Sequence, residues 1–294
     1  KGGFLLGASY VGTGARKQIL NPNLNQPRPG PGAVAPRRPF PQYNNITWIE
    51  GSGSSAYHAL QLTAERRMRA SLTLTANYTW SHSIGHGDFL NNRQNLYDLR
   101  AERGNGPYDV RHRLVVANVW QLPFGRGRKY GANLGRAADA ILGGWALNGI
   151  SNLYSGLPFT PTSSVNTLNG SGTQRPDRIA DGKLPGSQRS IDRWFDTSAF
   201  VTPAAFTFGN SGVNILHGPG TVQFDVGAAK SFAFRERFRL EYRAEFFNLF
   251  NTPQFNNPNA SVGAQGAGVI SSAGSKATFQ RTSRQIQMVL KLGF

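Results

Sequence analysis

The side chains best suited to chemistry are the five histidines, and two of these have the spacing of a metal-binding pair. His82 and His86 are four residues apart, a spacing that places two ligands on one face of a helix. This stretch instead leaves an alternating, strand-like segment and enters a glycine-rich one, so no helix is expected. We therefore expect an exposed loop without a metal ion here.

A second candidate is the acid and base in Tyr108-Asp109-Val110-Arg111-His112. Asp109 and His112 could assist a nucleophilic serine, but no Gly-x-Ser-x-Gly elbow accompanies them. We expect Asp109 to pair with Arg111 in a loop that returns to the sheet. We therefore expect no catalytic residues and no enzymatic activity.

Two further segments resemble ion sites only in part. Residues 169–181 contain Asp177 and Asp181 among Asn, Gly and Ser, but their spacing does not match the calcium loop of an EF-hand. Residues 125–128 read GRGR, but no helix follows them in the register of a phosphate-binding loop. We expect a solvated loop and a basic turn, respectively, and no metal or cofactor in the chain.

The charge balance is strongly basic, with 32 Lys and Arg against 15 Asp and Glu and a net charge of +17. Such an excess first suggests nucleic acid. The charges are scattered instead of gathered on one helix or aromatic sheet, so we do not expect a nucleic-acid partner. Lipopolysaccharide phosphates or an anionic ligand would account for the balance equally well. Cysteine is absent, which excludes a thiolate metal site.

The strongest structural signal is a period of two in the last segment, 284–294. Its sequence RQIQMVLKLGF alternates apolar residues with Gln285, Gln287, Val289, Lys291 and Gly293. Successive side chains of a strand point to opposite faces, so this strand has one apolar face and one largely polar face.

The segment 238–250 alternates in the same way and carries more charge. Arg239, Glu241, Arg243 and Glu245 share one face, while the other face is mostly aromatic or aliphatic. Four charges on one strand face would need dense pairing in a dry core, but they can line a water-filled lumen. We therefore expect these four residues, with Gln285, Gln287 and Lys291, to face a lumen.

Six more alternating segments bring the expected number of strands to about eight, each long enough to cross the apolar part of a bilayer. They are residues 4–12, 57–67, 71–81, 113–124, 144–157 and 221–234. Connections of a few residues alternate with long ones near 13–56, 82–112, 158–220 and 251–282. This pattern is typical of an outer-membrane β-barrel with long extracellular loops. The alternative from another class is a soluble β-sandwich that binds carbohydrate or nucleic acid.

Several motifs together resemble the TonB-dependent outer-membrane receptors of Gram-negative bacteria, specifically the Oar-like type. The resemblance is carried by the terminal strand ending in Phe294 and by the segments FRLEYRAEFFNLF (238–250), NTPQF (251–255), YHALQL (57–62), NYTWSHS (77–83), YDVRHR (108–113) and LPFGRGR (122–128). It extends over nearly the whole chain, 1–294.

The resemblance implies a barrel of roughly 22 strands, closed by an N-terminal plug, that carries a captured extracellular ligand across the outer membrane. Its implied partners are outer-membrane lipid and lipopolysaccharide, the TonB complex acting on the plug, and the barrel-assembly machinery. That machinery would read a terminal signal that includes Phe294 and Leu292. We find no plug or TonB box in 1–294. The expectation is therefore the C-terminal part of a receptor barrel, which forms an open, curved sheet when isolated.

Overall fold

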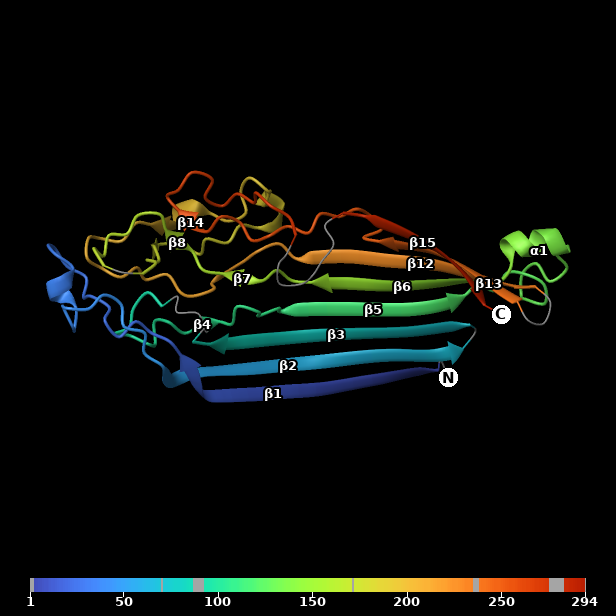
Figure 1. Ribbon diagram of the computed structural model, residues 1–294, viewed down its shortest axis with the longest axis horizontal. Helices are drawn as coiled ribbons and strands as arrows, with labels where there is room; N and C mark the ends of the chain where they lie inside the picture. The colour runs from blue at the N-terminus through green and yellow to red at the C-terminus, as the bar shows by residue number, and fades with distance from the viewer. Residues whose placement is uncertain are drawn as a thin grey trace.

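The computed structural model describes residues 3–69, 71–86, 93–170, 172–234, 238–274 and 283–293. Its main element is a nine-stranded antiparallel sheet in which eight long strands follow one another in chain order (Figure 1). These are β1 (Phe4–Leu20), β2 (Glu50–Arg69), β3 (Leu72–Gly85), β5 (His112–Gln121), β6 (Trp145–Tyr154), β12 (Thr221–Phe234), β13 (Phe238–Phe247) and β15 (Gln285–Gly293). The ninth strand, β4 (Gly104–Asn105), pairs with the end of β3. All eight expected strands are confirmed.

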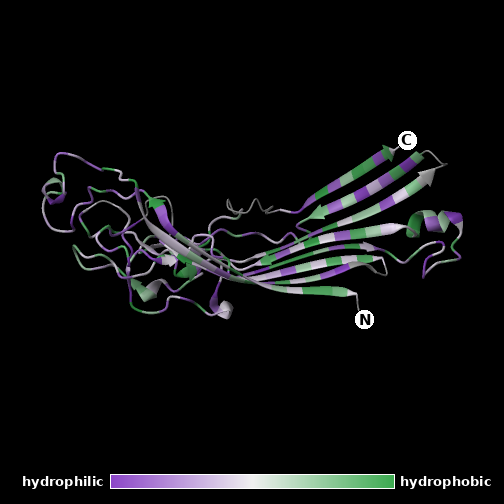
Figure 2. Ribbon diagram, turned by 90° about the horizontal axis from the view of Figure 1, so that it is seen from below, coloured by the Kyte–Doolittle hydropathy of each residue, from purple (hydrophilic) through white to green (hydrophobic). Residues whose placement is uncertain are grey.

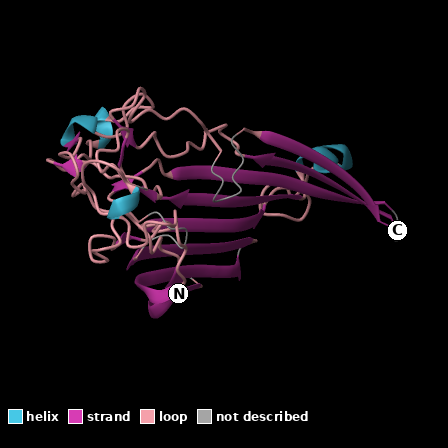
Figure 3. Ribbon diagram, turned by 60° about the vertical axis from the view of Figure 1, so that its left-hand side comes forward, coloured by secondary structure: helices cyan, strands magenta, loops and turns pink. Residues whose placement is uncertain are grey.

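The sheet is curved and open (Figure 3). Within the described residues, β1 pairs with β2 alone and β15 with β13 alone, so the sheet does not close on itself. The alternation of hydropathy is visible as bands of opposite character along the strands next to the C-terminus (Figure 2). This confirms the expected open, curved antiparallel sheet.

The connections differ at the two ends of the sheet. At one end β2 leads to β3 within a few residues, and a connection that contains the helix α1 (Arg136–Leu142) joins β5 to β6. The long connections all lie at the opposite end (Figure 1). The structure describes no helix that is long and apolar enough to cross a membrane.

The first long connection is shorter than the sequence predicts. Pairing of β1 with β2 continues through Arg16↔Ser54 and reaches Leu20↔Glu50, so the connection spans 21–49 and not 13–56. Residues 51–56 are small and lack alternating hydropathy, which hides this part of the hairpin from a pattern search. Similarly, β3 extends to Gly85, beyond the predicted loop start at residue 82.

The long connections pack together into what we call the loop cap, the described residues of 21–49, 86–111, 155–220 and 248–274. It contains short strand pairs, namely β9 (Asp177–Arg178) with β10 (Phe200–Val201), β7 (Pro158–Phe159) with β11 (Leu216–His217) and β8 (Thr162–Ser163) with β14 (Ser261–Val262). The 3-10 turns Ala35–Arg37, Gly186–Gln188 and Thr197–Ala199 also lie in it. A buried apolar cluster formed by Phe159, Phe195, Ala199, Phe200, Leu216 and Val262 holds it together.

Candidate functional site

The strand register divides the sheet into two chemically different faces. Residues directly opposite each other in an antiparallel pair lie on the same face. Thr63 lies opposite Asn77, and the pairing continues from Asn77 through Val115 and Asn152 to Gln223. We call this the polar face. It also carries Glu65, Thr73, Thr75, Thr79, Asn148, Asp225, Arg239, Glu241, Arg243, Glu245, Gln285, Gln287 and Lys291.

The opposite, apolar face carries large hydrophobic side chains on every long strand. They include Leu6, Leu62, Leu74, Leu114, Leu153, Phe224, Phe232, Leu240, Met288, Leu290 and Leu292. Leu6, Met288 and Leu290 are 74%, 67% and 68% exposed. So much exposed apolar surface requires a nonaqueous environment or a partner.

All seven residues predicted to face a lumen lie together on the polar face. Arg243 lies between two carboxylates, with its Nε 3.1 Å from Glu241 Oε1 and its Nη1 3.7 Å from Glu245 Oε1. Arg239 donates a hydrogen bond to Ser231 Oγ of β12. The strand register places these seven residues on one face of the sheet. That this face lines a lumen stays a prediction. Of the two residues predicted as an assembly signal, Leu292 lies on the apolar face and Phe294 lies outside the described residues.

Aromatic side chains with polar tips mark both ends of the apolar face. Near the loop cap, Tyr10 Oη lies 2.6 Å from His58 Nδ1, and Tyr78 Oη lies 2.8 Å from His112 Nδ1. At the other end Lys230 lies over the Trp145 ring, and its Nζ donates to the carbonyl oxygen of Asp139 in α1. Such rings favour the interface between apolar and aqueous regions.

The two histidines with the spacing of a metal pair, His82 and His86, are partly buried and do not form the exposed loop that the sequence predicts. His82 belongs to β3, and His86 follows immediately after the strand, where its Nδ1 accepts a hydrogen bond from Ser54 N. Four residues along a strand separate two side chains by roughly 13 Å, too far to share one ion. The described residues contain no cluster of three or more potential ligands.

The expected Asp109–Arg111 pair is confirmed, with Arg111 Nε 2.8 Å from Asp109 Oδ2. Asp109 is almost fully buried, lies 3.3 Å from His82 Nδ1, and accepts a hydrogen bond from Ser83 N. It therefore fixes the returning loop to the end of β3.

The segment 169–181, predicted as a solvated loop, is partly buried. Gln174 and Arg175 are 1% and 4% exposed, because they fill the interior of the loop cap. Asp177 accepts a hydrogen bond from Asn210 N, and Asp181 pairs with Arg178. By contrast, Arg126, Arg128 and Lys129 are exposed, in keeping with the expected basic turn.

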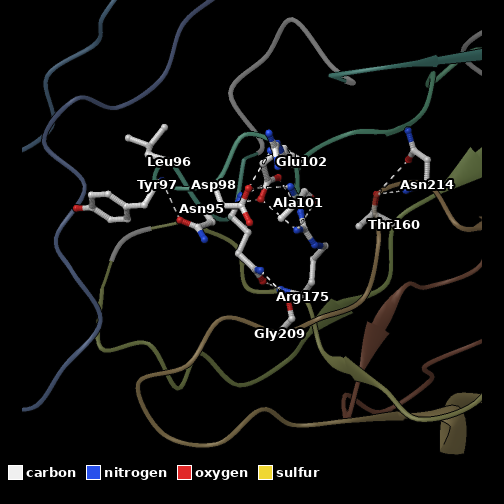
Figure 4. A network of polar contacts seen from close by, with 12 residues as sticks. Asn95, Leu96, Tyr97, Asp98, Ala101, Glu102, Thr160, Arg175, Gly209 and Asn214 are labelled. Carbon is white, nitrogen blue, oxygen red and sulfur yellow. Dashed lines mark hydrogen bonds and ion pairs between the residues drawn. The ribbon is translucent and has the colours of Figure 1, made fainter. Parts of the chain in front are cut away.

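A buried polar network inside the loop cap was not predicted (Figure 4). Arg175 donates to both carboxylate oxygens of Glu102, at 2.7 and 3.0 Å, and the two side chains are 4% and 2% exposed. Gln94 links Gln26 to Gly209, since its carbonyl accepts from Gln26 Nε2 and its Nε2 donates to the carbonyl of Gly209. Only a packed fold explains such burial of polar groups.

Tyr97 closes one side of this network. Its hydroxyl donates to the carbonyl oxygen of Gln26 at 2.6 Å, and the guanidinium of Arg28 lies over its ring. Burial raises the pKa of Tyr97, an effect that the positive charge of Arg28 partly opposes. The phenol therefore stays protonated and able to donate near neutral pH.

A cavity of about 300 Å³ lies beside this network, within the loop cap. Arg93, Glu102 and Arg175 line it together with His86, Thr160 and Asn214. The residues come from two separate connections, 86–111 and 155–220, so neither their proximity nor the cavity is visible in the sequence.

An open sheet of long antiparallel strands, with one polar and one exposed apolar face, defines a membrane β-barrel segment. A family model described as "Outer membrane beta barrel domain" matches residues 1–287, and the chain belongs to this family. The protein accordingly resides in the bacterial outer membrane. Neither a curated protein nor a solved structure matches the chain significantly.

Proposed function

We propose that this chain is a segment of a TonB-dependent receptor barrel, in which the loop cap captures an extracellular ligand and the polar face lines its passage. The polar face is the observation that carries the proposal. It holds Thr, Asn or Gln on most strands and both signs of charge on β13, which suits a water-filled lumen. The role is binding and passage, not catalysis.

The apolar face would then contact lipid, and its two ends would lie at the membrane interfaces. The long connections would be extracellular, since the short turns of such barrels lie on the periplasmic side. Exposed basic groups give the loop cap favourable contacts with lipopolysaccharide phosphates. The barrel-assembly machinery is the proposed partner during insertion.

The Oar-like motifs support the TonB-dependent part of the proposal. Its test uses the protein encoded by the native gene, purified in detergent, and the isolated periplasmic domain of TonB from the same organism. We expect saturable binding by surface plasmon resonance and its loss on deletion of any TonB box that the gene encodes. Absence of binding would leave a barrel without TonB coupling and contradict the proposal.

A further inference from the structure

The helix α1 lies at the end of the sheet opposite the loop cap and has two chemically different sides (Figure 1). The helical repeat of about 3.6 residues places Ile141 and Leu142 on one side and Arg136 and Asp139 on the other. In a water-soluble domain the apolar side would be buried against the protein. Here Ile141 and Leu142 are 70% and 57% exposed, so α1 turns its apolar side outward.

Hydrogen bonds attach α1 to the apolar face of the sheet. Trp145 Nε1 donates to the carbonyl oxygen of Ile141 at 2.8 Å. Lys230 Nζ donates to the carbonyl oxygens of Asp139 and Gly143. Trp145 and Lys230 lie directly opposite each other in the pair of β6 and β12, and both are on the apolar face. The exposed side of α1 therefore adjoins the surface assigned to lipid.

The turn that precedes α1 is closed by two exposed aromatic residues. Gly125 N donates to the carbonyl oxygen of Tyr130 at 2.9 Å, and the rings of Phe124 and Tyr130 lie 5.4 Å apart. Both aromatic side chains are 47% exposed. The Nζ of Lys129 lies 5.1 Å from the centre of the Tyr130 ring. This turn thus combines exposed aromatic groups with a cation, as α1 combines exposed aliphatic groups with one.

Cations outnumber carboxylates in this connection between β5 and β6. Residues 122–144 hold four basic side chains and one acidic side chain, so their net charge is +3. Asp139 is already engaged, because its Oδ1 accepts a hydrogen bond from Arg126 N at 2.7 Å. The basic side chains are all exposed, and none forms an ion pair within the described residues. They are Arg126, Arg128, Lys129 and Arg136.

We propose that residues 122–144, which we call the basic anchor, dock on anionic phospholipid headgroups at this end of the sheet. Ile141, Leu142 and the exposed rings enter the boundary of the acyl chains, while the basic side chains reach the lipid phosphates. An acidic protein could use the same charges. Lipid is favoured because the apolar side of α1 adjoins the lipid-facing side of the sheet.

The inference rests on residence in the outer membrane, and on the proposed function only in assigning this end of the sheet to the periplasmic leaflet. Its test uses the protein encoded by the native gene, with any cysteine elsewhere in it replaced by serine. Ile141→Cys is labelled with the fluorophore NBD and the protein is reconstituted into vesicles. Ile179→Cys is the matched control, because this isoleucine is 66% exposed and lies in the loop cap.

The vesicles contain phosphatidylcholine alone or with about 30% phosphatidylglycerol, and a lipid with a nitroxide on its acyl chain serves as quencher. We expect blue-shifted emission and quenching of the probe at position 141, and neither at position 179. Phosphatidylglycerol should raise the quenching at position 141 by about twofold or more, because each basic residue gains attraction to an anionic surface. The same quenching at position 179, or none at position 141, would overturn the proposal.

The charge dependence is tested further by combining Arg126→Gln, Arg128→Gln and Lys129→Gln. This triple variant should lose the increase caused by phosphatidylglycerol. The control combines Arg100→Gln, Lys183→Gln and Arg193→Gln, three exposed positions in the loop cap, and should keep it. Equal quenching in both vesicle types for the parent chain would contradict the assignment to anionic lipid, whether or not the triple variant folds.

Binding of the TonB domain is measured on the same samples. Retained TonB binding without quenching at position 141 contradicts only the basic anchor. Quenching that depends on phosphatidylglycerol, without TonB binding, contradicts only the proposed receptor class.

Discussion

At the residue scale, the ion-pair partner of Asp109 could be predicted from the sequence, whereas the partner of Glu102 could not. Asp109 and Arg111 are two residues apart, and their pairing could be predicted because local spacing permits it. Glu102 and Arg175 are 73 residues apart in sequence, and nothing in either neighbourhood marks the other as its partner. Polar residues in a glycine-rich connection resemble solvated loop residues until the packed fold is known.

The buried Arg175–Glu102 pair predicts a large effect of removing one charge. Glu102→Gln should destabilise the loop cap by about 3–5 kcal/mol, because it leaves the guanidinium buried without a counterion. Limited proteolysis of the purified protein measures this as earlier cleavage within 155–220. Lys183→Ala breaks an exposed pair with Asp181 and should cost less than about 1 kcal/mol. Equal sensitivity of the two variants would contradict the assigned role.

His217 predicts a pH dependence of the loop cap. Burial lowers the pKa of His217, an effect that Asp109 opposes and that Arg111, Lys183 and Arg189 reinforce. Below the ordinary histidine pKa of about 6.5, His217 therefore takes up a proton in the unfolded segment. In the folded segment it stays neutral. The stability contributed by neutral His217 is present above that pH and is lost as pH falls from it toward the lowered pKa.

Cleavage of the loop cap should accordingly quicken between pH 7.5 and pH 5.5, measured with a protease active at both values. The pKa of Asp196 is lowered, chiefly by its hydrogen bond from Ser198, so this carboxyl does not titrate in the same window. His217→Gln should flatten the dependence. A variant as pH-sensitive as the parent would show that another group is responsible.

At the element scale, the eight long strands could be predicted because one polar and one apolar face impose a period of two. The loop cap could not. Its core residues Phe159, Phe195, Leu216 and Val262 are single apolar positions separated by long stretches rich in Pro, Gly and Asn. No periodicity links them, so they resemble ordinary loop positions, and only tertiary packing brings them together.

The loop cap should behave as a folded unit that depends on this core. Phe195 is 2% exposed, so Phe195→Ala should cost about 3–5 kcal/mol and expose 155–220 to protease. Ile179→Ala, at a residue 66% exposed in the same connection, should change cleavage little. Protease cleavage of 155–220 in both variants, or in neither, would show that the buried apolar cluster does not stabilise the loop cap.

We expect an arginine substitution on the apolar face of the sheet to cost more folding stability than one on the polar face. Leu240→Arg and Leu290→Arg should each cost about 2–4 kcal/mol if their side chains lie near the bilayer midplane. Gln287→Arg, on the polar face, should cost much less. A reconstituted folding assay in lipid vesicles compares the three, and equal losses would reject the assignment of faces to lipid and lumen.

At the scale of the whole molecule, the sheet and the loop cap combine two environments in one chain. The apolar face has too much exposed hydrophobic surface for water, while the polar face has too much charge for lipid. A curved sheet with lipid against its apolar face and water against its polar face satisfies both requirements. In the proposed function, the buried core of the loop cap gives an extracellular ligand a preformed surface, which lowers the entropy cost of binding compared with disordered loops.

In the proposed arrangement, the polar face contacts water within a lumen and the apolar face contacts lipid. The chain contains no cysteine, so single substitutions in β3 supply unique labelling sites. The decisive measurement is the rate at which a charged thiosulfonate reagent labels Thr75→Cys, Asn77→Cys and Thr79→Cys, compared with Leu74→Cys, Ala76→Cys and Tyr78→Cys, in outer-membrane vesicles. We predict fast labelling of the first three and protection of the second three, an alternation with the period of the strand. Uniform labelling, or faster labelling of the second set, would contradict the account.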